Sequence, residues 1–142
     1  MNKRQLGNTN INLTAIGFGG APLGNLFENL DERNCYDILE KTYNEGINIY
    51  DTSPLYGYGL SEHRLGNFLK TVDEESYFLS TKVGRYLTPA KKESIDRGRF
   101  AGSLNFSPNL DYSYDGVMRA FEQSLLRFCL LYTSDAADET TG

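Results

Sequence analysis

Residues 48–59 read Asn-Ile-Tyr-Asp-Thr-Ser-Pro-Leu-Tyr-Gly-Tyr-Gly, and this stretch decides how the rest of the chain is interpreted. A short run of β-branched and aromatic residues ends in the acid Asp51, and a Pro turn and a Gly-rich loop follow it. Tyr56 lies in that loop, five residues after the acid. In open α/β folds the chemistry is found at the carboxyl ends of the strands. We therefore expect Asp51 and Tyr56 to lie at one rim of a sheet.

The segments around this stretch alternate between strand and helix patterns. In chain order we predict a hairpin of residues 3–6 and 11–13, a buried strand over 14–18, a helix over 31–45, a strand over 47–50, a helix that opens at 61–62, a strand over 76–81 and a helix capped by 111–115. Asp31 is the expected N-cap of the first helix, and Gly46 its expected C′ residue. Such alternation is typical of parallel strands joined by crossover helices, and it predicts the α/β class.

Each predicted helix carries one apolar stripe at helical spacing. The stripes consist of Cys35, Ile38, Leu39, Thr42 and Tyr43; of Leu65, Phe68 and Leu69; and of Val117, Ala120, Phe121, Ser124, Leu125 and Phe128. Residues 85–110 have no clean periodicity and contain Pro89 and Pro108. We expect them to form a long loop at the strand-end rim, where loops often carry function.

The last residues of the chain do not continue the pattern. A strand is expected after the third helix, but residues 133–142 are polar and have no apolar period. Such a composition does not form a buried parallel strand. We expect residues 1–128 to be one partial domain, and residues 129–142 to be a non-native or disordered tail that a truncation has left.

The composition indicates a globular chain and excludes several classes of function. Of the 142 residues, 39% are apolar and 23% charged, which argues against wholesale disorder. The net charge of -5 does not support nucleic-acid binding, which requires a basic face. Because no apolar run could span a bilayer and no signal peptide opens the chain, we expect no membrane partner and a cytoplasmic location. Cys35 and Cys129 are expected to be buried free thiols.

The glycines of residues 17–24 form a loop after the first buried strand. They do not have the spacing of the GxGxxG motif of dinucleotide-binding proteins, and Pro22 stands where the phosphate-facing helix should begin. A loop that lets another backbone or a ligand approach closely explains these glycines better.

Three ionisable residues, Asp51, Tyr56 and Lys82, stand at or just after predicted strand ends. If the strands are parallel neighbours, all three lie at the same rim. A tyrosine phenol is a poor proton donor or acceptor near neutral pH, but a nearby ammonium favours its ionised form, and a carboxylate can hold that ammonium in place. Such a group can protonate a carbonyl oxygen, or deprotonate an alcohol, as hydride moves at carbon. The hydride itself must come from a cofactor.

Each of these residues alone also has a structural explanation. Asp51 can cap the turn that follows it. Tyr56 can be a packed loop aromatic, and Lys82 a solvated surface charge. Their joint placement at successive strand ends favours the catalytic interpretation.

Four motifs make the chain resemble the N-terminal half of the aldo-keto reductases. They are Gly-Phe-Gly-Gly at 17–20, Tyr-Asp-Thr-Ser-Pro-Leu-Tyr-Gly at 50–57, Ser-Glu-His-Arg-Leu-Gly at 61–66 and Ser-Thr-Lys-Val-Gly at 80–84, in the order and spacing of that family. The resemblance implies a (β/α)8 TIM barrel whose bottom is closed by the N-terminal hairpin, and carbonyl–alcohol interconversion with NADP or NAD. Residues 85–116 further resemble the branch of aldose (fucose-type) and pyridoxal dehydrogenases.

The resemblance also implies a role for each matching residue. Tyr56 would be the general acid/base, Lys82 would tune it, and Asp51 would orient Lys82. Gly20, Ala21 and Asp51 would contact the nicotinamide end of the cofactor. The substrate would be a small-molecule carbonyl compound or a sugar.

The chain departs from this family after Phe128. The family has a catalytic His at the end of its fourth strand, whereas the only His here is His63, which we expect to be a partly exposed helix residue. We therefore expect the N-terminal portion of the barrel, truncated after about three βα units, with residues 1–142 inactive by themselves. The alternatives are a family member kept as a regulatory or binding subunit, and a non-functional fragment.

Overall fold

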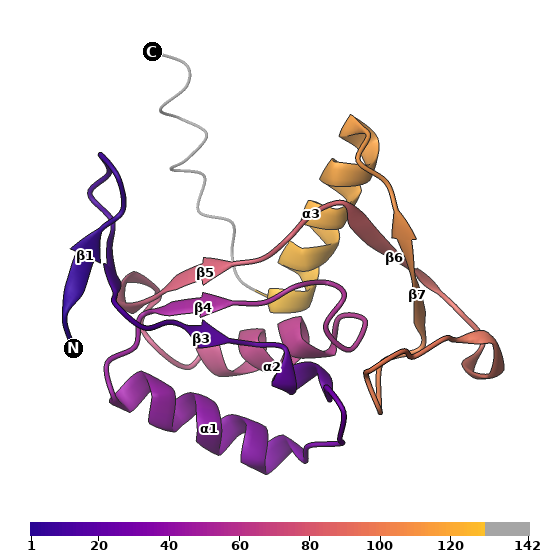
Figure 1. Ribbon diagram of the computed structural model, residues 1–142, viewed down its shortest axis with the longest axis horizontal. Coiled ribbons are helices and arrows are strands. Elements are labelled where there is room, and N and C mark those ends of the chain that lie inside the picture. The colour runs from indigo at the N-terminus through magenta and orange to yellow at the C-terminus, as the bar shows by residue number, and fades with distance from the viewer. Residues whose placement is uncertain (130–142) are drawn as a thin grey trace.

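The structure is a computed structural model that describes residues 1–129. Its elements, in chain order, are β1 (Lys3–Gln5), β2 (Asn12–Thr14), β3 (Phe18–Gly19), the 3-10 turn η1 (Pro22–Gly24), α1 (Glu32–Asn44), β4 (Ile49–Asp51), α2 (Leu60–Leu69), η2 (Glu74–Ser76), β5 (Phe78–Ser80), β6 (Arg85–Pro89), η3 (Lys92–Ser94), β7 (Phe106–Leu110) and α3 (Tyr114–Phe128). The described strands form the hairpin β1–β2, the parallel sheet β3–β4–β5 and the hairpin β6–β7 (Figure 1).

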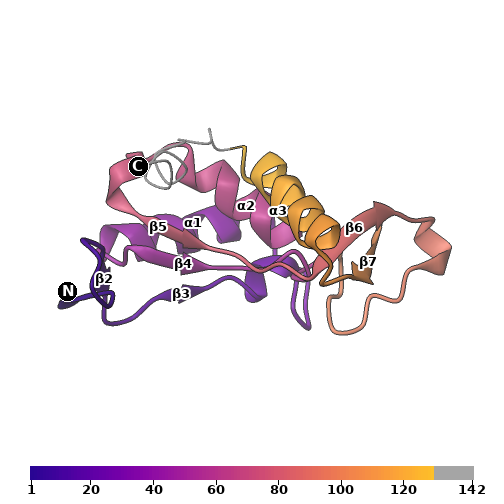
Figure 2. The same cartoon turned by 90° about the horizontal axis from the view of Figure 1, so that it is seen from above.

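The parallel sheet β3–β4–β5 is the centre of the fold. Its short strands are in register at their carboxyl ends, where Asp51 pairs with Gly19 on one side and with Ser80 on the other. The helices α1 and α2 lie together on one side of this sheet, and α3 packs beside α2 and β6 (Figure 1, Figure 2). The predicted α/β alternation is confirmed, because each crossover returns the chain to the same end of the sheet.

The apolar core lies between this sheet and the helices α1 and α2. Tyr50 of β4 is fully buried and belongs to one cluster with Leu39 of α1 and Phe68 of α2. Leu65 and Leu69 of α2 are fully buried in the same cluster, so the predicted stripe of that helix is confirmed. Burial of one such side chain contributes about 1.5–3 kcal/mol, and these contacts therefore hold the helices on the sheet.

The ends of α1 follow the local chemistry of the sequence. The Asp31 carboxylate accepts a hydrogen bond from the backbone N–H of Asn34 at 2.9 Å, as expected of an N-cap. Gly46 has a φ of +82°, as expected of a C′ residue. The apolar stripes are only partly correct, because Ile38 of α1 and Phe121 of α3 are exposed.

Residues 85–110 are not a long loop throughout, and this prediction is wrong. β6 and β7 pair antiparallel from Arg85 opposite Leu110 to Pro89 opposite Phe106. Only Leu87 of β6 is buried, so the sequence of this strand lacks the alternation of apolar and polar residues that predicts a strand. The other edge of β6 is closed by Gln123 of α3, whose side chain exchanges two hydrogen bonds of 2.8 Å with the backbone of Leu87.

The first strand of the parallel sheet is shorter than the predicted strand over 14–18. Thr14 belongs to β2 instead, and Ile16 is 62% exposed. The chain turns here because the side chains of Asn48 and Thr14 bond to each other's backbone. Thr14 N donates to Asn48 Oδ1 at 2.8 Å, and Asn48 N donates to Thr14 Oγ1 at 3.2 Å.

The predicted burial is correct for one of the two cysteines and for the histidine. Cys35 is a buried free thiol as expected, but Cys129 is exposed, so that part of the prediction is wrong. His63 on α2 is partly exposed, as expected. None of the helices within residues 1–129 is both long and apolar enough to cross a bilayer. The predicted tail lies outside the described residues, apart from Cys129.

Candidate active site at the strand-end rim

The parallel register of β4 and β5 brings Asp51 and Lys82 together. The ammonium of Lys82 lies 2.7 Å from Asp51 Oδ2 and donates a second hydrogen bond of 2.7 Å to the carbonyl of Thr52. The hydroxyl of Ser80, which stands opposite Asp51 in the sheet, donates to the other carboxylate oxygen at 3.0 Å. The carboxylate of Asp51 is therefore held on one oxygen by Ser80 of β5 and on the other by Lys82, two residues after that strand.

Tyr56 completes the group of three that the sequence predicts. The Lys82 ammonium lies 5.0 Å from the centroid of the Tyr56 ring. Burial would lower the pKa of Lys82, but the hydrogen bond to Asp51 and the charge of that carboxylate outweigh burial and raise this pKa above its ordinary value. Lys82 therefore stays charged near neutral pH, and a fixed positive charge stands beside the phenol. Such a charge stabilises the phenolate that remains when a phenol gives up its proton.

The neighbouring Tyr58 is bound in a way that leaves it no similar role. Its ring is buried, and its hydroxyl donates to the carbonyl of Asp96. Burial, followed by the charge of Asp96, raises the pKa of Tyr58. Tyr58 therefore keeps its proton, whereas Tyr56 is the tyrosine that faces the ammonium.

The backbone of Gly24 holds the Tyr56 loop in place. The carbonyl of Gly24 lies against Gly57, which has a φ of +65° in the left-handed region. A Cβ on Gly24 would meet the peptide between Tyr56 and Gly57. For Gly20 and Gly24 the interpretation as sites of close backbone approach is confirmed, since each lies against another segment of the chain, whereas a Cβ on Gly19 would meet nothing within 4 Å.

Gly20 and Ala21 lie at the same rim. The backbone N–H of Gly20 donates to the carbonyl of Asp51 at 2.7 Å, and a Cβ on Gly20 would come within 2.9 Å of that carbonyl. Ala21 lines a hollow of about 370 Å³ together with Tyr56. The predicted nicotinamide contacts thus lie beside the predicted acid/base, and the hollow is within the size range of small-molecule sites. The assignment of Gly20, Ala21 and Asp51 to the cofactor stays a prediction.

Tyr56 stands between two hollows. The larger one, of about 370 Å³, is bounded by apolar side chains that include Leu26, Leu55 and Phe100. The second, of about 270 Å³, is bounded by Tyr56, Lys82, Arg85 and Tyr112. A small molecule in either hollow would lie against Tyr56.

Phe100 is a candidate site residue that sequence reasoning missed. Its ring centroid lies 6.2 Å from that of Tyr56 and 6.2 Å from that of Tyr58. Backbone hydrogen bonds hold its segment in place: Phe27 N donates to Arg99 O at 2.7 Å, Ala101 N to Asn25 O at 2.9 Å, and Leu104 N to Gly57 O at 3.0 Å. These hydrogen bonds join backbone atoms only, so no pattern of residue types in the sequence could have indicated them.

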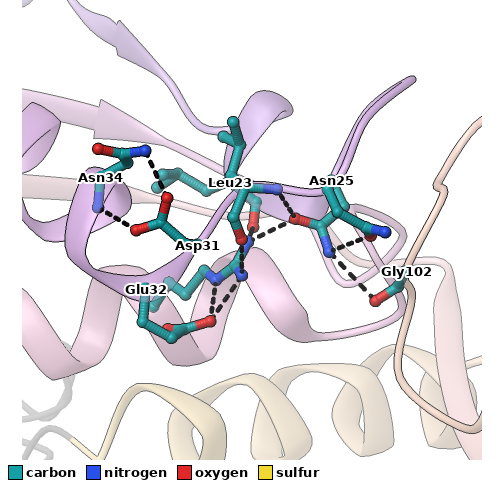
Figure 3. A network of polar contacts seen from close by, with 9 residues as sticks. Leu23, Asn25, Asp31, Glu32, Asn34 and Gly102 are labelled. Carbon is teal, nitrogen blue, oxygen red and sulfur yellow. Dashed lines mark hydrogen bonds and ion pairs between the residues drawn. The ribbon is translucent and has the colours of Figure 1, made fainter.

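Arg64 of α2 is a second missed residue, and it fixes the loop that follows Gly20 and Ala21. Its side chain is nearly fully buried and donates to the carbonyls of Leu23 and Leu30, each at 2.8 Å. It also donates to Asn25 Oδ1 at 2.7 Å and to Glu32 Oε1 at 2.6 Å. Figure 3 shows these contacts gathered between η1 and the start of α1. Five charged donors in a planar fork suit such a cluster of carbonyl oxygens.

Within residues 1–129 there is no cluster of three or more His, Cys, Asp or Glu side chains that could hold a metal ion. The rim brings together the ionisable side chains of Asp51, Tyr56 and Lys82, and Tyr56 lines two hollows there.

The family model and the similar proteins of known sequence point to the same family. The sequence pattern of the Aldo/keto reductase family matches residues 15–138. The chain is 42% identical over 148 aligned residues to a pyridoxal 4-dehydrogenase of Microbacterium luteolum, covering 94% of this chain and 43% of the relative. It is 47% identical over 132 residues to a D-threo-aldose 1-dehydrogenase of a Pseudomonas species, covering 87% of this chain and 40% of the relative. The chain thus spans about two fifths of the length of these relatives.

Solved structures agree. An aldo-keto reductase from Bacillus halodurans in its holo form superposes with a TM-score of 0.68 at 29% identity, covering 99% of this chain and 44% of that one. A glycerol dehydrogenase from Gluconobacter oxydans superposes with a TM-score of 0.67 at 20% identity, covering 90% of this chain and 36% of that one, and shows the fold alone. The described architecture is the N-terminal portion of their (β/α)8 barrel, with its hairpin and its first parallel strands. By its sequence match and its fold, the chain belongs to the aldo/keto reductase family.

Proposed function

We propose that the chain is the N-terminal part of an NAD(P)-dependent oxidoreductase that interconverts a carbonyl compound and an alcohol, with Tyr56 as the general acid/base. The observation that carries this proposal is the Lys82 ammonium, which lies over the Tyr56 ring and is bound to Asp51 at 2.7 Å. Family membership supports the reaction class. The activity of the whole protein remains a proposal, because the chain spans about two fifths of its relatives.

In the proposed reaction, each residue of the rim has a separate task. The bound cofactor supplies or accepts the hydride. Tyr56 gives its phenolic proton to the carbonyl oxygen, and in the reverse direction it takes the proton of the alcohol. Lys82 stabilises the phenolate left behind, and Asp51 keeps the ammonium in position. Gly20 and Ala21, beside Asp51, would contact the nicotinamide end.

The proposed substrate is a small-molecule carbonyl compound or a sugar. Two similar proteins are named for pyridoxal and for D-threo-aldoses, and both names describe small carbonyl compounds or their cyclic forms. The hollow beside Tyr56 supports a small substrate. NADP or NAD as cofactor and a cytoplasmic location stay predictions.

We also propose that residues 1–128 form the partial domain and that residues 129–142 are a non-native tail. The support is compositional, because residues 133–142 lack any apolar period. Sequencing the genomic reading frame beyond Phe128 tests this. A continuation through an apolar strand to a His is expected, whereas a frame that ends at Gly142 would contradict the proposal. For residues 1–142 alone we expect neither cofactor binding nor turnover, and quenching of NADPH fluorescence by this segment would show otherwise.

The acid/base role is tested by Tyr56→Phe in the protein expressed from the genomic reading frame. Aldehyde reduction should fall by at least about 10²–10⁴-fold, the usual contribution of a general acid. NADPH affinity should stay nearly unchanged, because the ring and the charge of Lys82 remain. Tyr36→Phe, which removes the hydroxyl of an exposed tyrosine on α1 that is not part of the predicted group of three, is the control. Wild-type turnover in Tyr56→Phe would show that the role is assigned wrongly.

A second candidate function is that of a regulatory or binding subunit. It is supported by 32% identity over 83 residues, or 56% of this chain, to a protein of Schizosaccharomyces pombe named for a voltage-gated potassium channel subunit beta. The rim residues do not separate the two functions, since a subunit can keep them. A partner that co-purifies with the expressed protein, together with no turnover on a panel of aldehydes and sugars, would favour the subunit.

A further inference from the structure

Two adjacent residues at the start of α2 reach the carboxyl ends of all three parallel strands. The hydroxyl of Ser61 donates to the carbonyl of Gly20, just after β3, at 2.7 Å. It lies 2.8 Å from the hydroxyl of Thr52, just after β4. Because Ser61 has one hydroxyl proton and gives it to Gly20, Thr52 must be the donor in the second bond. Glu62 accepts from the hydroxyl of Thr81, just after β5, at 2.7 Å.

Glu62 makes this connection as a buried charge. Its side chain is 0% exposed, and the oxygen that accepts from Thr81 also accepts from Ser124 of α3 at 2.8 Å. Its other oxygen accepts from Arg127 Nε. Burying a charged pair gains little stability over apolar packing of the same shape. What the carboxylate provides and apolar side chains do not is direction, because each hydrogen bond fixes the place of its donor.

The bonds of Ser61 and Glu62 end next to the catalytic group. Thr52 follows Asp51 in the chain, and Thr81 precedes Lys82. The side chains of Asp51 and Lys82 are 45% and 46% exposed, and an ion pair so exposed contributes little energy to fixing its own geometry. The buried bonds of Ser61 and Glu62 to the neighbouring strand ends therefore add a constraint that the exposed pair lacks.

We propose that Ser61 and Glu62 are positioning residues that hold the Asp51–Lys82 pair beside Tyr56. Ser61 sets the ends of β3 and β4, and Glu62 sets the end of β5 through Thr81. This inference rests on the proposed function for its catalytic meaning. The geometric part can be measured without turnover.

The first test compares two variants that each remove one hydroxyl from the same oxygen of Glu62. Thr81→Val cuts the bond that leads to Lys82, and Ser124→Ala cuts the bond from α3. Both are made in the protein expressed from the genomic reading frame. The readout is competitive acetylation of Lys82 by trace acetic anhydride, followed by mass spectrometry, with the exposed Lys41 as internal reference.

In the parent, the bond to Asp51 should keep the labelling of Lys82 well below that of Lys41. Thr81→Val should raise it toward the rate of Lys41, Thr81→Ser should restore the parental rate, and Ser124→Ala should leave that rate unchanged. Equal labelling in Thr81→Val and the parent, or an equal rise in Ser124→Ala, would overturn the proposal. Should Thr81→Val not fold, Ser61→Ala cuts the connection to the other two strand ends and is judged by the same readout.

A second measurement separates this proposal from the proposed function. In an active enzyme, Thr81→Val should lower kcat and shift the pH profile while KM stays near the parental value, and Ser124→Ala should do neither. A labelling change in a protein without turnover would keep the positioning role and contradict the proposed reaction. Turnover with no labelling difference between Thr81→Val and the parent would support the proposed reaction and contradict the positioning role.

Discussion

Replacement of Gly24 by alanine is expected to slow catalysis by moving Tyr56. The backbone of Gly24 lies directly against the peptide between Tyr56 and Gly57. A Cβ on Gly24 would stand 2.6 Å from Gly57 N and 2.8 Å from the carbonyl oxygen of Tyr56, whereas ordinary van der Waals contact begins at 3.4 Å. Because both neighbours are backbone atoms, no side-chain rotation can relieve the overlap.

The size of the effect follows from the size of the overlap. The peptide that carries Tyr56 must retreat by up to about 1 Å, and a misplacement of this size can lower catalysis about 10²-fold. That loss equals about 2.7 kcal/mol of transition-state stabilisation. The same overpacking should lower the free energy of unfolding by about 1–3 kcal/mol. The expected signature is thus a large loss in kcat/KM in a protein that still folds.

The assay is kcat/KM together with thermal unfolding, with Gly19→Ala as the matched control. Gly19 belongs to the same Gly-rich segment, and a Cβ there would have no atom within 4 Å. Gly19→Ala should therefore keep kcat/KM and stability close to the parental values. If the two variants have the same kcat/KM, the contact between Gly24 and the Tyr56 loop does not set the position of the phenol, and the reasoning is refuted.

Two further predictions concern charge and shape at the rim. Because Asp51 raises the pKa of Lys82 above its ordinary value of 10.5, Lys82 should stabilise the fold fully below pH 10.5, and this contribution should be lost as pH rises through the raised pKa. The free energy of unfolding is measured in urea for the parent and for Lys82→Met, with Lys41→Met as control. The difference between the parent and Lys82→Met should shrink as pH rises through the raised pKa of Lys82, and a difference that stays constant would contradict the pairing. Phe100→Ala should lower kcat/KM for an aromatic aldehyde by about tenfold, because the wall facing Tyr56 is lost. Phe27→Ala, at a side chain 72% exposed, should not, and equal kcat/KM in the two variants would exclude Phe100 from the substrate wall.

The parts of the fold that the sequence could predict are those in which neighbours in the chain decide the structure. The Asp31 cap and the left-handed Gly46 follow from local hydrogen bonding and sterics. The pairing of Asp51 with Lys82 could be predicted for a different reason, because these residues are far apart in the chain. Parallel strands with crossover helices bring successive carboxyl ends together, and the alternating pattern was enough to show that topology.

The parts that could not be predicted depend on contacts between distant backbone segments or on buried charges. The segment around Phe100 is held by backbone hydrogen bonds from Phe27 to Arg99 and from Ala101 to Asn25. The two residues of each bond are more than 70 positions apart, and a backbone bond does not depend on which side chains those residues carry. Glu62 and Arg64 read as the solvent-facing side of a helix, because such residues are almost never fully buried unless paired. Their partners come from α3 and from the loop before α1, which no helical pattern reveals.

The burial of these charges explains how α2 can begin where it does. Its N-cap is Gly59, which has no side chain to accept from the first turn, so local capping does not fix the helix start. Ser61, Glu62 and Arg64 are all buried in the first turns, and each bonds to a segment other than α2. The helix start is therefore held by the strand ends and the loop after β3. Because the Tyr56 loop runs directly into this start, the same polar contacts that anchor α2 also limit where the phenol can lie.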